Sequence, residues 1–179
     1  RCIPNLIVMA PADENECRQM LYTAYMHPGP AAVRYPRGQG IGATITQHMH
    51  VIPIGKADIK RHGEKIAILA FGSMLTPALQ VGDIMNATVL NMRFVKPLDG
   101  KLLHTIFQKF KKIITIEDGC IMGGMGSAIL EFMADNNYSA RVTRLGIPDK
   151  YIHHGTPAEL YAECGFDVAG IIKSIKEIT

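Results

Sequence analysis

The alternation of short apolar runs with helix-length amphipathic segments is the feature that most constrains how this chain folds. From Glu64 onward, apolar runs at residues 66–71, 87–92, 113–116 and 142–145 alternate with segments that repeat apolar side chains every three or four residues. Strands separated by helices of about ten to fifteen residues pair in parallel through right-handed crossovers. The sequence therefore predicts an α/β domain with a mainly parallel open sheet flanked by helices.

Local signals indicate where the expected helices begin. Helix-capping residues stand before each amphipathic segment, and Pro follows two of them. The expected caps are Thr76, Asp99, Ser127, Thr156 and Asp167. Residues 156–159 form a full capping box, and Gly165 ends the short helix that follows it.

Residues 1–48 carry one more strand–helix–strand unit. An apolar strand is expected at residues 6–9, a helix capped by Asp13 with Glu16 in a capping box, and a second strand at 31–35. The chain begins Arg-Cys-Ile-Pro, without an initiator Met, and enters this strand at once. We expect a fragment: 1–48 as the last βαβ piece of a second α/β domain, 49–64 as linker and first strand region, with a strand at 52–59 and a turn at 60–63, and 65–179 as the main domain.

Composition narrows the function classes. Hydrophobic residues make up 47% and the net charge is +3, which is typical of a globular protein and gives no support for a nucleic-acid partner. Apolar stretches are too short for a membrane helix. The histidines, including the 48/50 and 153/154 pairs, lack metal-ligand spacing, so no metal site is predicted. The cysteines, which form no CxxC pair, favour a reduced, intracellular setting; they are Cys2, Cys17, Cys120 and Cys164.

Residues 34–38, Arg-Tyr-Pro-Arg-Gly, follow an expected strand, where open parallel sheets bind ligands. Arg34 and Arg37 offer guanidinium groups suited to a phosphate or a carboxylate, and Pro36 and Gly38 shape the turn. Surface ion pairs or a contact between domains are the commoner use of such residues. Alternation of side chains predicts that the two arginines do not share one ligand.

A glycine-rich stretch, residues 119–127, runs from a strand end into a helix start. Backbone N–H groups there can bind an anion, which makes Gly123, Gly124, Gly126 and Ser127 candidates. The stretch lacks the P-loop ending and the GxGxxG fingerprint, so close packing of helix on strand is the favoured alternative. Glu117 and Asp118 project apart in a strand, so we expect a helix cap or a contact between domains rather than a catalytic acid pair.

Seven motifs, in order along the chain, resemble those of bacterial 1-deoxy-D-xylulose-5-phosphate synthases, a family of the transketolase superfamily. They lie at residues 1–5, 13–16, 34–38, 54–56, 92–99, 122–127 and 145–149. Transketolases and pyruvate dehydrogenase β subunits share the Lys/Arg-Pro-Leu-Asp and glycine-loop elements. The turn at 34–38 is more particular to the synthases.

This resemblance implies a cytoplasmic, homodimeric transferase that uses thiamine diphosphate and Mg²⁺. Such enzymes condense pyruvate with D-glyceraldehyde 3-phosphate with loss of CO₂, for isoprenoid, thiamine and pyridoxal biosynthesis. Residues 1–48 would belong to the pyrimidine-binding domain and 65–179 to a transketolase-like C-terminal domain. Arg37 resembles the arginine that binds the acceptor phosphate, and Arg34 is a weaker candidate. The catalytic and metal-binding residues would lie upstream, so none is expected here.

Two other hypotheses remain. The chain can be part of a transketolase or of a 2-oxo acid dehydrogenase β subunit, or it can be a stand-alone α/β interaction module. The module predicts that the first strand has partners within the chain. The fragment hypothesis predicts an unpaired sheet edge and an exposed apolar face in residues 1–48, and no activity of the chain alone.

Overall fold

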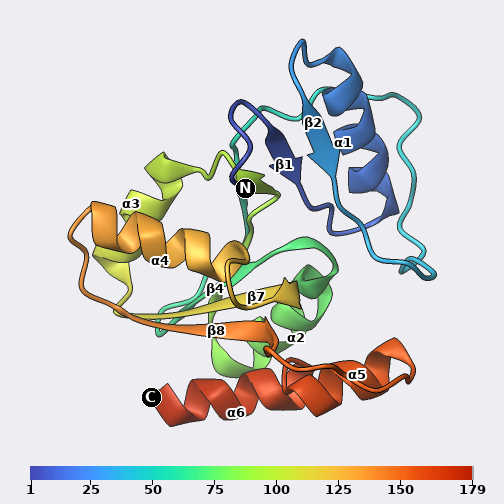
Figure 1. Cartoon of the computed structure of the whole chain (residues 1–179). Helices are drawn as coiled ribbons and strands as arrows, with labels where there is room; N and C mark the ends of the chain where they lie inside the picture. The colour runs from blue at the N-terminus through green and yellow to red at the C-terminus, as the bar shows by residue number, and fades with distance from the viewer. Residues whose placement is uncertain (179) are drawn as a thin grey trace.

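Two sheets organise the chain (Figure 1), which a computed structural model describes over residues 1–178. The larger sheet has the strand order β3-β5-β4-β7-β8. Its strands are β3 (Asp58–Arg61), β4 (Ala67–Ala70), β5 (Thr88–Asn91), β7 (Lys112–Cys120) and β8 (Arg141–Ile147). Parallel pairing joins all of them except β3, which pairs antiparallel with β5 at one edge. The predicted open, mainly parallel sheet is confirmed.

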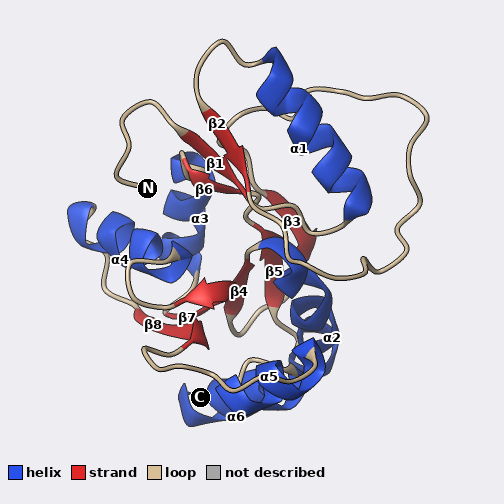
Figure 2. Ribbon diagram, turned by 45° about the vertical axis from the view of Figure 1, so that its right-hand side comes forward, coloured by secondary structure: helices blue, strands red, loops and turns tan. Residues whose placement is uncertain are grey.

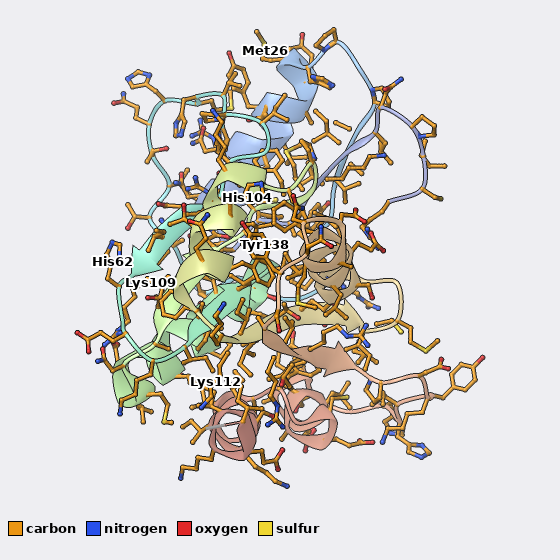
Figure 3. All side chains as sticks on the ribbon, turned by 90° about the vertical axis from the view of Figure 1, so that its left-hand side faces the viewer. Met26, His62, His104, Lys109, Lys112 and Tyr138 are labelled. Atoms are coloured by element: carbon orange, nitrogen blue, oxygen red, sulfur yellow. The ribbon has the colours of Figure 1, made fainter. Side chains whose placement is uncertain are left out.

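Helices cover both faces of this sheet (Figure 2). They are α2 (Leu75–Met85), α3 (Gly100–Lys109), α4 (Met125–Asp135), α5 (Pro157–Cys164) and α6 (Val168–Ile178). Because successive side chains of a strand point to opposite faces, Ile68 packs with α2 and α6 while Leu69 packs with α3 and α4. His104 of α3 and Tyr138, which follows α4, meet at the join of these helices, with Nδ1 and Oη 2.8 Å apart (Figure 3).

The smaller sheet combines strands from both sides of the predicted domain boundary. It has the order β2-β1-β6, with strands β1 (Ile7–Met9), β2 (Ala31–Val33) and β6 (Phe94–Lys96). Helix α1 (Glu14–Met26) connects β1 to β2, which are parallel, as the sequence predicted. Strand β6 was not predicted. It pairs antiparallel with β1, and the buried ring of Phe94 packs with Met9 and Met20.

This pairing bears on the edge expected in residues 1–48. Strand β1 has a partner on each side within the chain, as the interaction-module hypothesis predicts. The unpaired edge that the fragment hypothesis predicts in residues 1–48 is present at β2, whose outer side pairs with no strand of residues 1–178. The exposed apolar face is present, on α1 and the segment after β2: Leu21, Tyr25, Met26, Tyr35, Ile41, Ile45 and Met49 are all exposed.

Residues 34–57 form neither helix nor strand and run along the outside of α1 (Figure 1). The strand expected at 52–59 is therefore wrong, since β3 begins only at Asp58 and extends into the predicted turn at 60–63. The reason is a turn at Gly55, whose φ of +69° suits glycine and breaks the extended run. This turn packs against Pro97, and a Cβ on Gly55 would lie 3.0 Å from its Cγ.

The helix starts show which capping signals act. Asp99 caps α3, Thr156 and Glu159 close the capping box of α5, and Asp167 accepts the N–H of Gly170, all as predicted. Thr76 and Ser127 do not cap. Helix α2 begins at Leu75 after a 3₁₀ turn (Gly72–Met74), and α4 begins at Met125. Helix α2 starts earlier than predicted because it continues the 3₁₀ turn, and α4 starts earlier because the Glu117 carboxylate accepts the Met125 and Gly126 N–H groups.

No helix within residues 1–178 is both long enough and apolar enough to cross a membrane.

Candidate functional site

The Arg34–Gly38 turn lies at the carboxyl end of β2, beside that of β1. The Arg34 N–H donates to Met9 O at 2.8 Å, which fixes the start of the turn. The guanidinium of Arg34 points toward the larger sheet, with Nη1 4.0 Å from Asp118 Oδ2. Arg37 is exposed and makes no hydrogen bond or ion pair with the rest of residues 1–178. The two arginines thus have different surroundings.

A pocket of about 510 Å³ opens between this turn and the first half of α1. Tyr35, Pro36 and Gly38 line it from the turn, whereas Arg37 is not among the lining residues. Its walls are mainly apolar and include Leu21 and Met49. The geometry places a guanidinium without an internal partner at the margin of an apolar pocket.

Asp118 links the turn to the C-terminal half of the chain. Tyr161 of α5 donates its hydroxyl to Asp118 Oδ2 at 3.0 Å. Burial, and then the charge and hydrogen bond of Asp118, raise the pKa of Tyr161 to about 12. Tyr161 is therefore protonated near neutral pH and acts as a hydrogen-bond donor. Asp118 thus contacts Arg34 of the N-terminal unit and Tyr161 of α5, whereas a contact between domains stays a prediction.

Glu117 fills the helix start that the sequence offered to an anion. Its buried carboxylate accepts the N–H groups of Met125 and Gly126, each at 2.8 Å. A carboxylate at a helix N-terminus satisfies unpaired N–H groups and complements the helix dipole. The predicted helix cap is confirmed for Glu117, and an external anion would have to compete with this carboxylate.

Two glycines of the candidate anion loop, Gly124 and Gly126, have a packing role, whereas a Cβ on Gly123 would contact nothing within 4 Å. A Cβ on Gly124 would lie 2.2 Å from Cys120 O, and one on Gly126 would lie 2.5 Å from Thr115 Oγ1. The Ser127 hydroxyl donates to Ile121 O at 3.1 Å, which explains why it does not cap α4. Gly123, Gly124, Gly126 and Ser127 as an anion site stay a prediction, and this geometry favours the packing alternative.

A second polar cluster, at the junction of the two sheets, was missed by sequence reasoning. The buried Glu16 carboxylate accepts the N–H of Ala12 at 2.7 Å, Asn91 Nδ2 at 2.9 and 3.0 Å, and Arg93 Nε at 2.7 Å. Arg93 also reaches Asp58, with Nη2 and Oδ2 3.3 Å apart. Glu16 therefore does not close the expected capping box, although Asp13 caps α1 as predicted. The available signal was the polar pair Asn91 and Arg93 beside an apolar strand.

Among the described residues, no group of three or more His, Cys, Asp or Glu side chains is arranged to hold a metal ion. The four cysteines are free thiols, and burial raises the pKa of Cys17 and of Cys164. The candidate site is therefore Arg37, whose guanidinium suits a phosphate or a carboxylate, beside the apolar pocket.

Two family models match the chain. The transketolase pyrimidine-binding domain matches residues 1–41, and the transketolase C-terminal domain matches residues 55–171. The turn at 34–38 falls within the first match. The division at 1–48, 49–64 and 65–179 stays a prediction.

Two similar curated relatives carry the same name. The chain is 57% identical over 177 residues to 1-deoxy-D-xylulose-5-phosphate synthase of Nitrosomonas europaea and 55% identical to that of Methylobacillus flagellatus. In each case the match covers 99% of this chain and 29% of the relative, so the chain spans less than a third of their length.

Solved structures agree on the fold. A split-gene transketolase, described as an inactive β4 tetramer, superposes with a TM-score of 0.85 at 25% identity, covering 99% of this chain and 58% of that one. Transketolase from Campylobacter jejuni superposes with a TM-score of 0.65 at 16% identity, over 99% of this chain and 27% of that one. The matched models, covering residues on both sides of the linker, establish that the chain belongs to the transketolase family.

Proposed function

We propose that this chain is the C-terminal part of a 1-deoxy-D-xylulose-5-phosphate synthase. The complete enzyme would be a thiamine-diphosphate-dependent transferase that condenses pyruvate with D-glyceraldehyde 3-phosphate with loss of CO₂. Identity of 50 to 57% to synthases of that name, along 99% of the chain, supports this. The product would supply isoprenoid, thiamine and pyridoxal biosynthesis.

In this proposal, Arg37 binds the phosphate of the acceptor. The observation that carries the assignment is the state of the two guanidinium groups: Arg34 faces Asp118, whereas Arg37 is exposed and has no partner within residues 1–178. A planar guanidinium forms paired hydrogen bonds with a phosphate, and one already engaged with a carboxylate is less available. Arg34 is therefore the weaker candidate.

The cofactor and metal enter the proposal only through the longer enzyme. The described residues hold no cluster of carboxylates or histidines that fits Mg²⁺, so they do not fit a metal–diphosphate site by themselves, and no reaction step is derived through one. The longer enzyme would be a cytoplasmic homodimer with small-molecule substrates and without nucleic-acid or membrane partners.

Replacing Arg37 in the full-length enzyme tests the assignment. Loss of one charged hydrogen-bonding group, worth about 1.5–3 kcal/mol, raises the KM for D-glyceraldehyde 3-phosphate by about tenfold or more in Arg37→Ala. The kcat/KM for unphosphorylated glyceraldehyde changes much less. Arg34→Ala, the matched arginine removal, has the smaller effect on phosphate preference. An unchanged KM for the phosphorylated acceptor in Arg37→Ala would refute the assignment.

The isolated chain is expected to be inactive, because the proposal places the groups that ionise the cofactor outside it. The split-gene transketolase that superposes on this chain is itself described as inactive. The assay combines the polypeptide with pyruvate, D-glyceraldehyde 3-phosphate, thiamine diphosphate and Mg²⁺, and product is measured against a protein-free blank. Turnover above the blank would contradict this expectation.

A further inference from the structure

Hydrogen bonds fix the backbone on both sides of the turn that carries Arg37. Upstream, the Arg34 N–H donates to Met9 O of β1. Downstream, the N–H groups of Gly42 and Ala43 donate to the Glu14 carboxylate, at 2.7 Å to Oε1 and 3.3 Å to Oε2. The Arg37 side chain forms no hydrogen bond or ion pair with the other described residues. The direction of its guanidinium therefore depends on where the hydrogen bonds on both sides of the turn place the backbone.

Glu14 begins a row of side chains on α1 that hold the segment 42–52, here called the strap. The row satisfies backbone groups of a segment that forms no helix or strand, and such groups need partners. Asn15 Oδ1 accepts the Thr46 N–H at 2.9 Å, Gln19 Oε1 that of His50 at 2.7 Å and Thr23 Oγ1 that of Ile52 at 2.9 Å. Arg18 donates to Thr46 O. Glu14 is the member of this row nearest to the turn.

Gly42 of the strap and Gly40 just before it fit the backbone around the Glu14 carboxylate. Gly42 has a φ of +79°, in the region that favours glycine. A Cβ on Gly40 would lie 2.0 Å from Glu14 Oε1, so a side chain there would displace the carboxylate. Gly40 and Ile41 also line the pocket beside the turn. Glu14 thus positions one pocket wall and the turn together.

We propose that Glu14 is a positioning residue, which holds Arg37 toward the acceptor phosphate through the amides of Gly42 and Ala43. The inference rests on the proposed function of Arg37. Glu14 acts in its ionised form, the strongest acceptor of N–H groups. Hydrogen bonds from its own N–H and from Gly42 lower the pKa of this carboxyl below its usual value.

The test compares acceptors in the full-length enzyme. Glu14→Ala raises the KM for D-glyceraldehyde 3-phosphate by about tenfold with kcat within about twofold, because the guanidinium is misplaced rather than removed. Unphosphorylated glyceraldehyde is used as before. Glu14→Gln, which keeps an oxygen for the Gly42 N–H, restores most of the phosphate preference. Gly40→Ala acts like Glu14→Ala, and Glu64→Ala, an exposed acid elsewhere, has no effect.

A second readout follows the strap itself. Hydrogen exchange of residues 39–47, measured by mass spectrometry, becomes faster in Glu14→Ala and stays slow in Glu14→Gln and Glu64→Ala. If Arg37→Ala loses phosphate preference while Glu14→Ala keeps it, or if exchange in Glu14→Ala is unchanged, the positioning role is wrong and the proposed function stands. If Arg37→Ala keeps its phosphate preference, the function of Arg37 fails first and the positioning role with it.

Discussion

Glu117 occupies, with its own carboxylate, the kind of helix start at which nucleotide-binding proteins hold a phosphate. The sequence shows glycines between a strand end and a helix start, and it correctly favours a cap for Glu117. It does not show which anion satisfies the Met125 and Gly126 N–H groups, since that depends on how far α4 approaches β7. The distances of 2.8 Å answer the question for this chain.

Removing that carboxylate has a measurable cost. In Glu117→Ala, the buried N–H of Gly126 and the part-buried N–H of Met125 lose a charged acceptor, and we expect the free energy of unfolding to fall by about 3 kcal/mol. Urea denaturation of the chain measures the change. Glu64→Ala, which removes an exposed acid, stays within about 0.5 kcal/mol of the parent. A loss below about 1 kcal/mol in Glu117→Ala would show that water or another acceptor replaces the carboxylate.

Whether the other site residues could be predicted depends on how far away their partners lie in the sequence. The Arg34–Gly38 turn was predictable, because strand ends in parallel sheets gather ligand-binding residues. Glu14 and Arg93 were not, since their partners lie 28 and 77 residues away. Such contacts depend on tertiary register, which a single sequence does not display.

Among the elements, helices capped by their own neighbours were predictable and the others were not. The caps of α3 and α5 lie within three residues of the N–H groups that they bind. The acceptor for α4 is Glu117, eight residues before Met125. Strand β6 was missed because it is three residues long and its partner, β1, lies far away in the sequence, near the N-terminus.

The start of α5 is expected to respond to acid. Both the hydroxyl and the N–H of Thr156 donate hydrogen bonds to the Glu159 carboxylate. These bonds lower its pKa below the ordinary 4.5, and the hydroxyl has the larger effect. A lowered folded-state pKa stabilises the fold at pH values above 4.5, and this contribution is lost as the pH falls through the lowered value. NMR titration of Glu159 checks the shift: Thr156→Ala moves the pKa upward, whereas Thr105→Ala, an exposed threonine of α3, does not. An identical Glu159 pKa in Thr156→Ala would contradict the capping role.

Across the whole molecule, the junction of the two sheets depends on a buried ion pair. Glu16 of α1 and Arg93, which follows β5, meet with both side chains largely buried, and Asn91 and Asp58 complete the cluster. Removing one partner of such a pair leaves the other charge buried without compensation, which lowers the stability of the fold. The cluster therefore couples the N-terminal unit to the larger sheet.

Arg93→Ala is expected to lower the free energy of unfolding by about 3 kcal/mol and to broaden the urea transition, since the two sheets then unfold less cooperatively. Circular dichroism and fluorescence of a bound dye follow the transition. Lys150→Ala, which removes an exposed ion pair with Glu163, changes stability by less than about 0.5 kcal/mol. Equal effects of the two variants would mean that the junction does not depend on Arg93.

Strand β6 has a consequence for exchanging segments between family members. A chimera joined at the linker takes residues 94–96 from one family member and β1, the strand to which they hydrogen-bond, from another. The packing of Phe94 against Met9 then depends on side chains from two sequences that diverged separately. Swaps that carry residues 7–10 along with the C-terminal half should give soluble hybrids more often than swaps at the linker alone.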